Sequence, residues 1–332
     1  MMLSVIIPAY NREATIVKTL ESVFRQTDHS IDYEVIVVDD GSSDHTVDVC
    51  EHLTALHPQL RVVTGQHGGP GNARNRGVAA ARGSYIWFID SDDFIEEGAF
   101  AVVQKKMVRG CDAIVFPGAN LVNGTKVRRS SYAHLAGQVV TGAQFLSSVI
   151  DCNLLKLKSR FSPSVLSFLF SRDFLTSQHL SMLPEIYHED LEFTPRALMA
   201  AQTVLVLDEI LYLVNLTQNS IVRSVNQKKA YDNLTVVRSL YDYVQSHPSG
   251  YDRKQYAIMG IAFCNSLEEI WKAKAYHEKR YINDLRENSA VYRRVLSRSY
   301  YGKFLLMAVV LRLAPTFLVS FYNRFLKKLS LY

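Results

Sequence analysis

The chain has 332 residues, of which 48% are hydrophobic and 21% are charged. This balance excludes a chain that is disordered throughout, and the length is sufficient for two domains. The formal net charge of +5 is unevenly distributed, since residues 1–222 carry a net charge of −6 and residues 223–332 a net charge of +11.

The cysteines and the first residues predict a cytoplasmic protein. The four cysteines are far apart, show no paired metal-ligand spacing, and are expected to be buried in a reducing compartment. Residues 1–8 read as a strand, not as the basic and then long apolar pattern of a secretory signal peptide. We therefore expect the chain to stay on the side of the membrane where it is made.

The first hundred residues alternate short apolar runs with helical spacing. The predicted strands are residues 3–8, 33–38, 60–63 and 85–89, and the predicted helices are residues 13–26, about 44–56, and 73–82. Continuous β-branched and aromatic strands separated by helices predict an α/β fold, with a mostly parallel sheet covered by helices on both faces. Helical spacing dominates from about residue 226, so we predict one domain at 1–222 and a helical C-terminal region at 223–332.

Polar residues follow three of the predicted strands. These strand ends are Pro8-Ala9-Tyr10-Asn11, Asp39-Asp40-Gly41-Ser42 and Asp90-Ser91-Asp92-Asp93. Ligands of open α/β sheets bind at the carboxyl ends of the strands. The sequence therefore predicts that these three segments converge on one ligand site.

The acidic cluster at residues 90–93 predicts a divalent metal site. Three carboxylates in four positions repel one another unless a cation is near. Mg²⁺ or Mn²⁺ commonly uses one or two protein carboxylates and completes its coordination with substrate phosphates and water. Asp90 and Asp92, which are separated only by Ser91 at the end of a predicted strand, suit that arrangement. The structural alternative is that Asp92 or Asp93 caps a helix predicted at residues 94–108.

The other strand ends suggest recognition of a nucleotide. Asp40 could accept hydrogen bonds from the edge of uracil or another base, although Asp-Gly-Ser is also a good turn sequence. Tyr10 could stack on the base or simply pack, and Asn11 could fix its loop. Residues 68–75 form a glycine-rich loop at the start of a helix, where backbone N–H groups favour anions and Arg74 adds positive charge.

Together these segments resemble glycosyltransferase family 2. The matching pieces are Val5 to Asn11, Val37 to Asp44, Gly69 to Gly77, Tyr85 to Asp93 and His188-Glu189-Asp190-Leu191-Glu192-Phe193. The resemblance implies a GT-A fold and an inverting transfer of a sugar from a nucleotide-sugar. The Gln-x-x-Arg-Trp motif of processive synthases is missing, which favours transfer of a single sugar.

The resemblance also implies roles for single residues. The segment from Pro8 through Ala9 to Tyr10, together with Asp40, would line the base. Arg74 would reach the base or the phosphates, Asp90 would contact the ribose or the sugar, and Asp92 would hold the metal.

Asp190 would be the catalytic base. An acceptor hydroxyl needs a base in line with the departing diphosphate, which supports this role on chemical grounds. The structural alternative is that Asp190 is an ordinary acidic residue in the first turn of a helix.

The last forty-five residues have no acidic side chain and eight basic ones. After Pro315, polar residues recur at steps of three and four, as in a basic amphipathic helix at a membrane interface. Residues 304–311 are apolar but too few to span a bilayer. We expect this tail to bind an anionic membrane surface, the alternative being a helix packed on the protein or on a second copy.

The sequence thus predicts a metal-dependent, inverting glycosyltransferase that acts at the cytoplasmic face of a bacterial membrane in surface-polysaccharide assembly. The expected partners are a UDP-sugar, a lipid-linked or glycan acceptor and the membrane surface, with Mn²⁺ or Mg²⁺ as cofactor and no nucleic acid. A homo-oligomer is left open. The alternatives are a non-catalytic nucleotide-sugar-binding or membrane-associated module, or a nucleotidyltransferase.

Overall fold

The computed structural model describes residues 2–26, 31–107, 110–122, 124–130, 132–154, 164–216, 226–247, 253–299, 307–311 and 315–326. Contacts divide the chain into two compact units. The first comprises residues 1–145, 158–185 and 197–218, and the second comprises residues 146–157, 186–196 and 219–332. The domain boundary predicted at residue 222 lies outside the described residues and stays a prediction.

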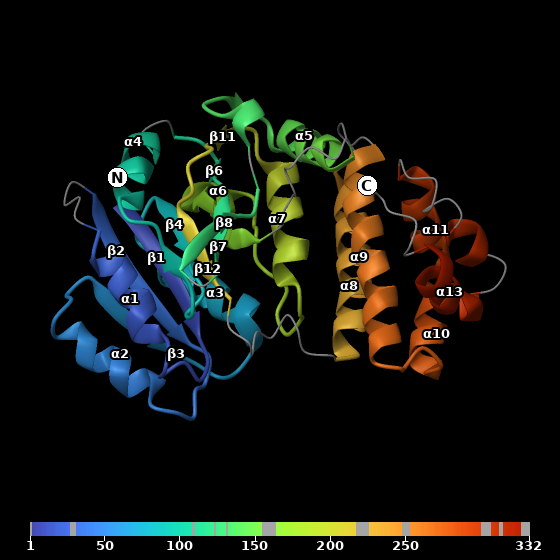
Figure 1. The fold of residues 1–332 in the computed structure, drawn as a ribbon, viewed down its shortest axis with the longest axis horizontal. Helices are drawn as coiled ribbons and strands as arrows, with labels where there is room; N and C mark the ends of the chain where they lie inside the picture. The colour runs from blue at the N-terminus through green and yellow to red at the C-terminus, as the bar shows by residue number, and fades with distance from the viewer. Residues whose placement is uncertain are drawn as a thin grey trace. The chain divides into compact units, whose positions relative to one another are not determined.

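Within the described residues, eight strands form the large sheet of the first unit (Figure 1). Its order is β3-β2-β1-β4-β10-β6-β11-β9. The strands are β1 (Met2–Ala9), β2 (Asp32–Asp39), β3 (Leu60–Thr64), β4 (Tyr85–Phe88), β6 (Ala113–Val115), β9 (Val139–Val140), β10 (Phe168–Ser171) and β11 (Val204–Val206). Among these described strands, only β10 and β9 run against their neighbours. The predicted α/β class with a mostly parallel sheet is confirmed.

Helices of the first unit follow the strands in chain order. They are α1 (Ile16–Phe24), α2 (Thr46–Thr54), α3 (Gly69–Ala80), α4 (Ala99–Met107) and α6 (Arg172–Ser177), with the 3-10 turns η1 (Ala133–Leu135) and η2 (Val165–Ser167). Helix α3 packs closely on β1, and Gly77 permits this approach. A Cβ atom at Gly77 would lie 2.3 Å from Cγ2 of Ile6. A side chain at this position would push α3 and its arginines away from the strand ends.

A second sheet corrects one sequence expectation. Its order is β5-β12-β7-β8, with the strands β5 (Phe94–Ile95), β7 (Gly118–Val122), β8 (Thr125–Arg128) and β12 (Tyr212–Asn215). Phe94 and Ile95 pair with Leu213 and Tyr212, and helix α4 starts only at Ala99. The helix predicted from residue 94 was therefore wrong at its start, because a strand more than a hundred residues away in sequence captures these two residues.

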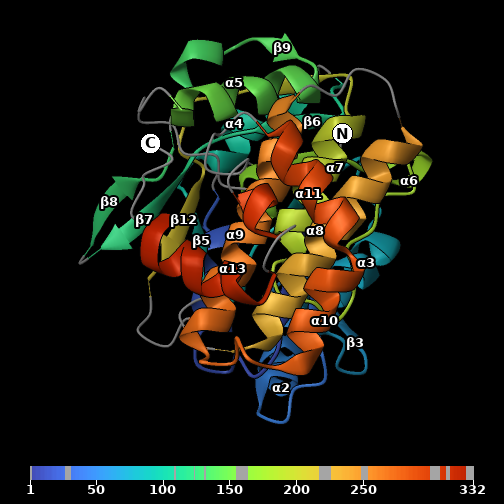
Figure 2. The ribbon, with the colours of Figure 1, turned by 90° about the vertical axis from the view of Figure 1, so that its right-hand side faces the viewer.

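The second unit is helical, as Figure 2 shows. Its helices are α8 (Lys228–Ser246), α9 (Arg253–Lys272), α10 (Lys279–Glu287), α11 (Ser289–Arg298) and α13 (Pro315–Phe321), followed by the π-helical turn η4 (Tyr322–Leu326). Helices α5 (Gly142–Leu154) and α7 (Glu189–Ala200) include residues of both units. The predicted helical C-terminal region is confirmed.

Part of the predicted membrane-binding tail packs on the protein. Leu318 and Val319 of α13 are fully buried, and α13 lies against α9. The hydroxyl of Tyr322 donates to Glu268 at 3.1 Å, while the ring of Phe317 is 48% exposed. None of the helices in the described residues is long and apolar enough to cross a membrane. Lys327 and Lys328 lie outside those residues, and membrane binding stays a prediction.

The buried carboxylate of Glu34, on β2, holds together the start of β1 and the residues just before β4. Glu34 is only 5% exposed and accepts hydrogen bonds from the Ser4 hydroxyl at 2.7 Å and the Arg82 N–H at 2.6 Å. Arg61 donates to its other oxygen at 2.7 Å. Burial raises the pKa of Glu34, but these hydrogen bonds and the charge of Arg61 outweigh burial and hold the pKa below its ordinary value.

Glu34→Gln is expected to lower the free energy of unfolding at pH 7 by about 1–3 kcal/mol, because a charged acceptor is lost. The pKa of Glu34 is lower in the folded protein than in the unfolded chain, where it is about 4.3. The ionised carboxylate therefore stabilises the fold above about pH 4.3, and this stabilisation is lost as the pH falls through the folded pKa. The difference between wild type and variant should therefore shrink below about pH 4. Urea unfolding of both proteins, from pH 7 to below about pH 4, measures this difference in the free energy of unfolding. A difference that does not change with pH would contradict the prediction.

Candidate active site

The ends of β1, β2 and β4 meet at one edge of the large sheet. Ala9, the last residue of β1, lies opposite Asp39, the last residue of β2, and the N–H of Asp40 donates to the Ala9 carbonyl at 2.8 Å. On the other side of β1, the N–H of Ile89 donates to Ile6 at 3.0 Å. The structure thus brings together the three polar segments that the sequence predicted to converge.

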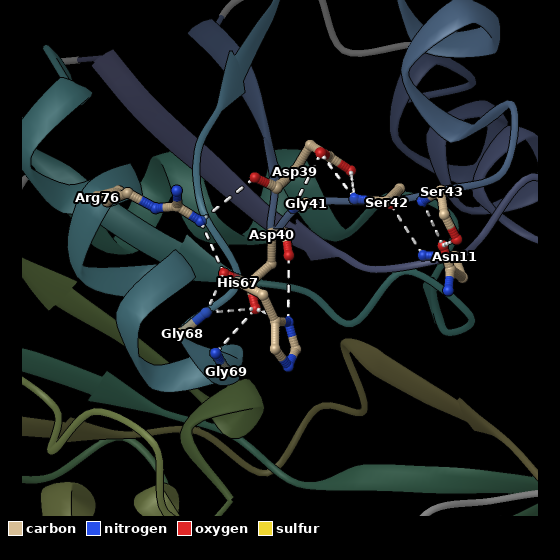
Figure 3. A network of polar contacts seen from close by, with 10 residues as sticks. All are labelled: Asn11, Asp39, Asp40, Gly41, Ser42, Ser43, His67, Gly68, Gly69 and Arg76. Carbon is tan, nitrogen blue, oxygen red and sulfur yellow. Dashed lines mark hydrogen bonds and ion pairs between the residues drawn. The ribbon is translucent and has the colours of Figure 1, made fainter.

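The carboxylate of Asp40 is buried and surrounded by donors (Figure 3). Gly69 N–H donates to Oδ2 at 2.8 Å, and Gly68 N–H lies 3.1 Å from Oδ1. Arg76 donates to Oδ1 at 2.8 Å, and Nδ1 of His67 lies 2.9 Å from Oδ2. The anion at the start of α3 in this structure is therefore the carboxylate of Asp40, and these two backbone N–H groups are engaged by it.

His67 also lies against the aromatic ring predicted to stack on a base. The rings of Tyr10 and His67 have centroids 4.4 Å apart and planes at 34°. Tyr10 is 45% exposed, and the His67 side chain is 59% exposed. The imidazole thus contacts both predicted base-binding groups, the face of Tyr10 and the carboxylate of Asp40.

Asn11 fixes the loop after β1, as the sequence suggested. It has a positive φ of 52°, and its own N–H donates to the Ser42 hydroxyl at 2.9 Å. Its side-chain oxygen accepts from the Ser43 N–H at 2.9 Å. Pro8 and Ala9 are the last two residues of β1, and Ala9 is buried. These contacts hold the ends of β1 and β2 in register around Tyr10.

Two arginines face the acidic cluster after β4. Arg74 of α3 is only 5% exposed and donates to Oδ1 of Asp90 at 2.7 Å. Arg12 lies 3.8 Å from Oδ2 of Asp92. Burial, and next the charge of Asp90, raise the pKa of Asp92, while Arg12 lowers it. Asp90 and Asp92 thus each lie beside an arginine.

Asp93 anchors the segment between β4 and β5 to β12. It is 4% exposed, accepts from the Tyr212 hydroxyl at 2.7 Å, and accepts from the Asn215 N–H at 2.8 Å. The same Tyr212 oxygen accepts from the Asp90 N–H at 3.1 Å. The alternative that Asp93 caps the next helix is wrong, because β5 follows it and α4 starts six residues later.

Asp190 lies in the second unit, in the first turn of α7. Its Oδ1 accepts from the Leu191 N–H at 2.8 Å. His188, two residues earlier, has a positive φ of 65°, and burial lowers its pKa below the ordinary value, which favours the neutral ring. First-turn placement agrees with the capping alternative as well as with the base, and the role of Asp190 stays a prediction.

Comparisons with known proteins agree with this arrangement. The family model described as glycosyl transferase family 2 matches residues 4–153. The uncharacterized glycosyltransferase EpsJ of Bacillus subtilis (strain 168) is 30% identical over 234 residues, which is 70% of this chain and 65% of EpsJ. The chain belongs to glycosyltransferase family 2. It spans just under two thirds of the length of EpsJ.

Two further similarities concern a shorter segment and the fold of this family 2 member. Poly(ribitol-phosphate) beta-glucosyltransferase of Bacillus spizizenii (strain ATCC 23059 / NRRL B-14472 / W23) is 41% identical over 97 residues, covering 29% of this chain and 15% of that protein. The crystal structure of S. aureus TarS 1-349 in complex with UDP-GlcNAc has a TM-score of 0.74 at 21% identity, and covers 98% of this chain and 92% of that one. The predicted GT-A fold is thereby confirmed.

The residues of this family 2 domain fit a hard divalent cation. Carboxylate oxygens are the donors that Mg²⁺ and Mn²⁺ prefer, and the Asp92 side chain keeps 27% of its surface exposed. Asp93 is occupied by Tyr212 and Asn215. No group of three or more His, Cys, Asp or Glu side chains suited to a metal occurs in the described residues. A cation here would therefore take one or two aspartates and complete its coordination with donor phosphates and water.

Four polar contributors to the site were not singled out from the sequence. They are Arg12, His67, Arg76 and Tyr212. Arg76 lies within a segment that matched the family and Arg12 directly follows one, so their positive charge was a usable signal. His67 directly precedes the glycine-rich loop. Tyr212 has no local signal, because it is 119 residues from its partner Asp93.

Proposed function

We propose that this chain transfers one sugar from a UDP-sugar to a hydroxyl of a lipid-linked or polysaccharide acceptor, with inversion, in surface-polysaccharide assembly. The observation that carries the proposal is the convergence of a polar and aromatic end (Tyr10 and Asp40) and a charged end (Arg12 and Asp92) on one sheet edge. TarS, which was crystallised with UDP-GlcNAc, and the poly(ribitol-phosphate) glucosyltransferase support the donor and the kind of acceptor.

The base would bind at the end formed by Tyr10 and Asp40. A uracil N3–H is a donor, and a buried carboxylate is a strong acceptor for it. Both oxygens of Asp40 already have donors, of which His67 is the most exposed. A base edge would thus take the place of the His67 imidazole on Asp40 and on the ring of Tyr10.

The diphosphate would lie beside Arg12 and the acidic cluster. Arg12 supplies positive charge beside Asp92, and Arg74 holds Asp90 in place from its buried position. When bound, Mg²⁺ or Mn²⁺ would supply Lewis-acid stabilisation of the charge that develops on the leaving diphosphate. Asp92 would hold this ion, and Asp90 and Ser91 would face the donor.

Asp190 would accept the proton of the acceptor hydroxyl as the bond to the anomeric carbon forms on the side opposite the departing UDP. This single displacement inverts the anomeric centre. The basic C-terminal tail would keep the enzyme at the cytoplasmic face of the membrane, beside a membrane-anchored acceptor. The net charge of +11 over residues 223–332 supports this location.

A thermal-shift screen of nucleotide-sugars with and without Mn²⁺ tests the donor. We expect UDP-sugars to raise the melting temperature more than other nucleotide-sugars, and more with Mn²⁺ than without. Product analysis separates the second enzyme class, since a nucleotidyltransferase would form diphosphate where this proposal requires UDP. Absence of any shift with all nucleotide-sugars would count against the proposal.

His67→Ala is expected to bind UDP about 3–10-fold more tightly than wild type. The reason is that the imidazole must leave Tyr10 and Asp40 before a base can bind, and removing it removes that competing contact, of the order of one hydrogen bond. Isothermal titration calorimetry with UDP measures the change.

Pyrophosphate is the matched control ligand, because it has no base, and its affinity should be the same in both proteins. Weaker binding of UDP to His67→Ala would show that the imidazole contacts the base in the complex and does not compete with it.

A further inference from the structure

The turn that leads to Asp190 is held in an uncommon backbone conformation. His188 has a φ of 65°, in the left-handed region that non-glycine residues rarely adopt. The N–H of Leu191 donates to the His188 carbonyl at 3.0 Å, which closes a turn around Glu189 and Asp190. Such a conformation costs about 1–3 kcal/mol and persists only when the surroundings hold it.

Helix α8 of the same unit holds the residue just before this turn. The N–H of Tyr187 donates to Oδ2 of Asp232 at 2.8 Å, and Asp232 is only 7% exposed. Lys228, one helical turn earlier, donates to the same oxygen at 2.7 Å. This contact fixes the backbone three residues before Asp190.

The ring of Tyr187 is held by the start of α8 as well. The ammonium groups of Lys228 and Lys229 lie 5.2 Å and 5.6 Å from its centroid, within cation–π range. Asn226, just before α8, donates from its side-chain amide to the Tyr187 hydroxyl at 3.3 Å. Tyr187 is therefore constrained at its backbone, its ring face and its hydroxyl.

Helix α8 makes a second contact just after Asp190. Glu192 is fully buried and accepts two hydrogen bonds from Arg196, at 2.8 Å and 2.9 Å. The hydroxyl of Ser239 on α8 donates to the same carboxylate at 2.8 Å. Asp232 and Ser239 are seven residues apart, about two turns along one face of the helix. They contact the chain on either side of Asp190.

We propose that Asp232 and Ser239 are positioning residues for Asp190, so that α8 of the C-terminal region sets the geometry of the catalytic base. The inference rests on the proposed function, because it takes Asp190 as the base. Catalytic groups must be held within about 0.5 Å of the productive geometry, and a misplacement of about 1 Å can cost 10²-fold in rate. A turn with a left-handed residue on its entry side keeps that geometry only while its anchors are in place.

Replacing Asp232 tests the inference. Asp232→Ala is expected to lower kcat about 10–100-fold, with the KM for the UDP-sugar within about 3-fold of wild type. Asp232→Asn keeps an oxygen for the Tyr187 N–H and should recover most of kcat. Ser239→Ala is a milder second variant that leaves Asp232 intact, and should lower kcat about 2–10-fold.

Leu318→Ala is the control for general destabilisation of the same unit, since it empties a buried position of α13 and should leave the kcat of the folded enzyme unchanged. In an Asp190→Asn background, Asp232→Ala should cause no further loss of kcat, because both changes act through the same base.

The outcomes separate this inference from the proposed function. If Asp190→Asn lowers kcat but Asp232→Ala and Ser239→Ala do not, the positioning role is overturned and the base remains. Equal losses with Asp232→Asn and Asp232→Ala, or additive losses with Asp190→Asn, would also overturn it. If Asp190→Asn leaves kcat unchanged, Asp190 is not the catalytic base, and that part of the proposed function is wrong.

Discussion

Asp190→Asn is expected to lower kcat by about 10²–10⁴-fold, because the amide cannot accept the proton of the acceptor hydroxyl. The KM for the donor should change little, since Asp190 is proposed to act on the acceptor. Steady-state kinetics with a UDP-sugar and an acceptor, measured at saturating donor, give both values. The free energy of unfolding should change by no more than about 1 kcal/mol, as for an acidic residue in the first turn of a helix.

Asp173→Asn is the matched control. Asp173 is an exposed acidic residue in the first turn of α6, so the same isosteric change is made at an equivalent helix position. It should leave kcat unchanged. If Asp190→Asn also kept kcat within about threefold, the effect would be no larger than that of an ordinary first-turn acid, and the helix-capping alternative would stand.

Asp92→Asn is expected to reduce the rate of sugar transfer by about 10²–10³-fold, the range found when one preorganised electrostatic group is removed from a transition state. The dependence of the residual rate on Mn²⁺ should also weaken, because the amide is a poorer ligand for a hard cation. Rates measured over a series of Mn²⁺ concentrations give the activity and the apparent metal affinity together.

Asp93→Asn distinguishes the metal role of Asp92 from a general effect of charge in the cluster. The Asp93 carboxylate accepts from Tyr212 and from Asn215, so its replacement should destabilise the fold by about 1–3 kcal/mol. It should leave the apparent Mn²⁺ affinity close to that of wild type. If the two variants lost Mn²⁺ affinity equally, Asp92 would not be the distinct ligand that we propose.

The residues at the sheet edge of the site could be predicted from the sequence, because the patterns that mark strand ends lie within a few neighbouring residues. Continuous apolar runs followed by Tyr10, Asp40 and Asp90 place these residues at the ends of parallel strands, whose ends meet at one edge. The structure brings those strand ends together.

Strand β5 and the hydrogen bonds of Tyr212 and Ser239 could not be predicted, because they depend on contacts between residues far apart in the sequence. Phe94 and Ile95 form a strand only because β12 pairs with them, although their own surroundings favoured a helix. The Tyr212 hydroxyl reaches Asp93 across 119 positions, and Ser239 reaches Glu192 across 47. Local periodicity carries no information about such partners.

The most direct test of the central claim is the release of UDP from a panel of UDP-sugars by the well-folded 332-residue chain, with Mn²⁺ and with a chelator in its place. The account predicts release from at least one UDP-sugar, dependent on Mn²⁺ and reduced at least 10²-fold by Asp92→Asn. Release or binding of no nucleotide-sugar at all, or release unaffected by both the chelator and Asp92→Asn, would contradict it.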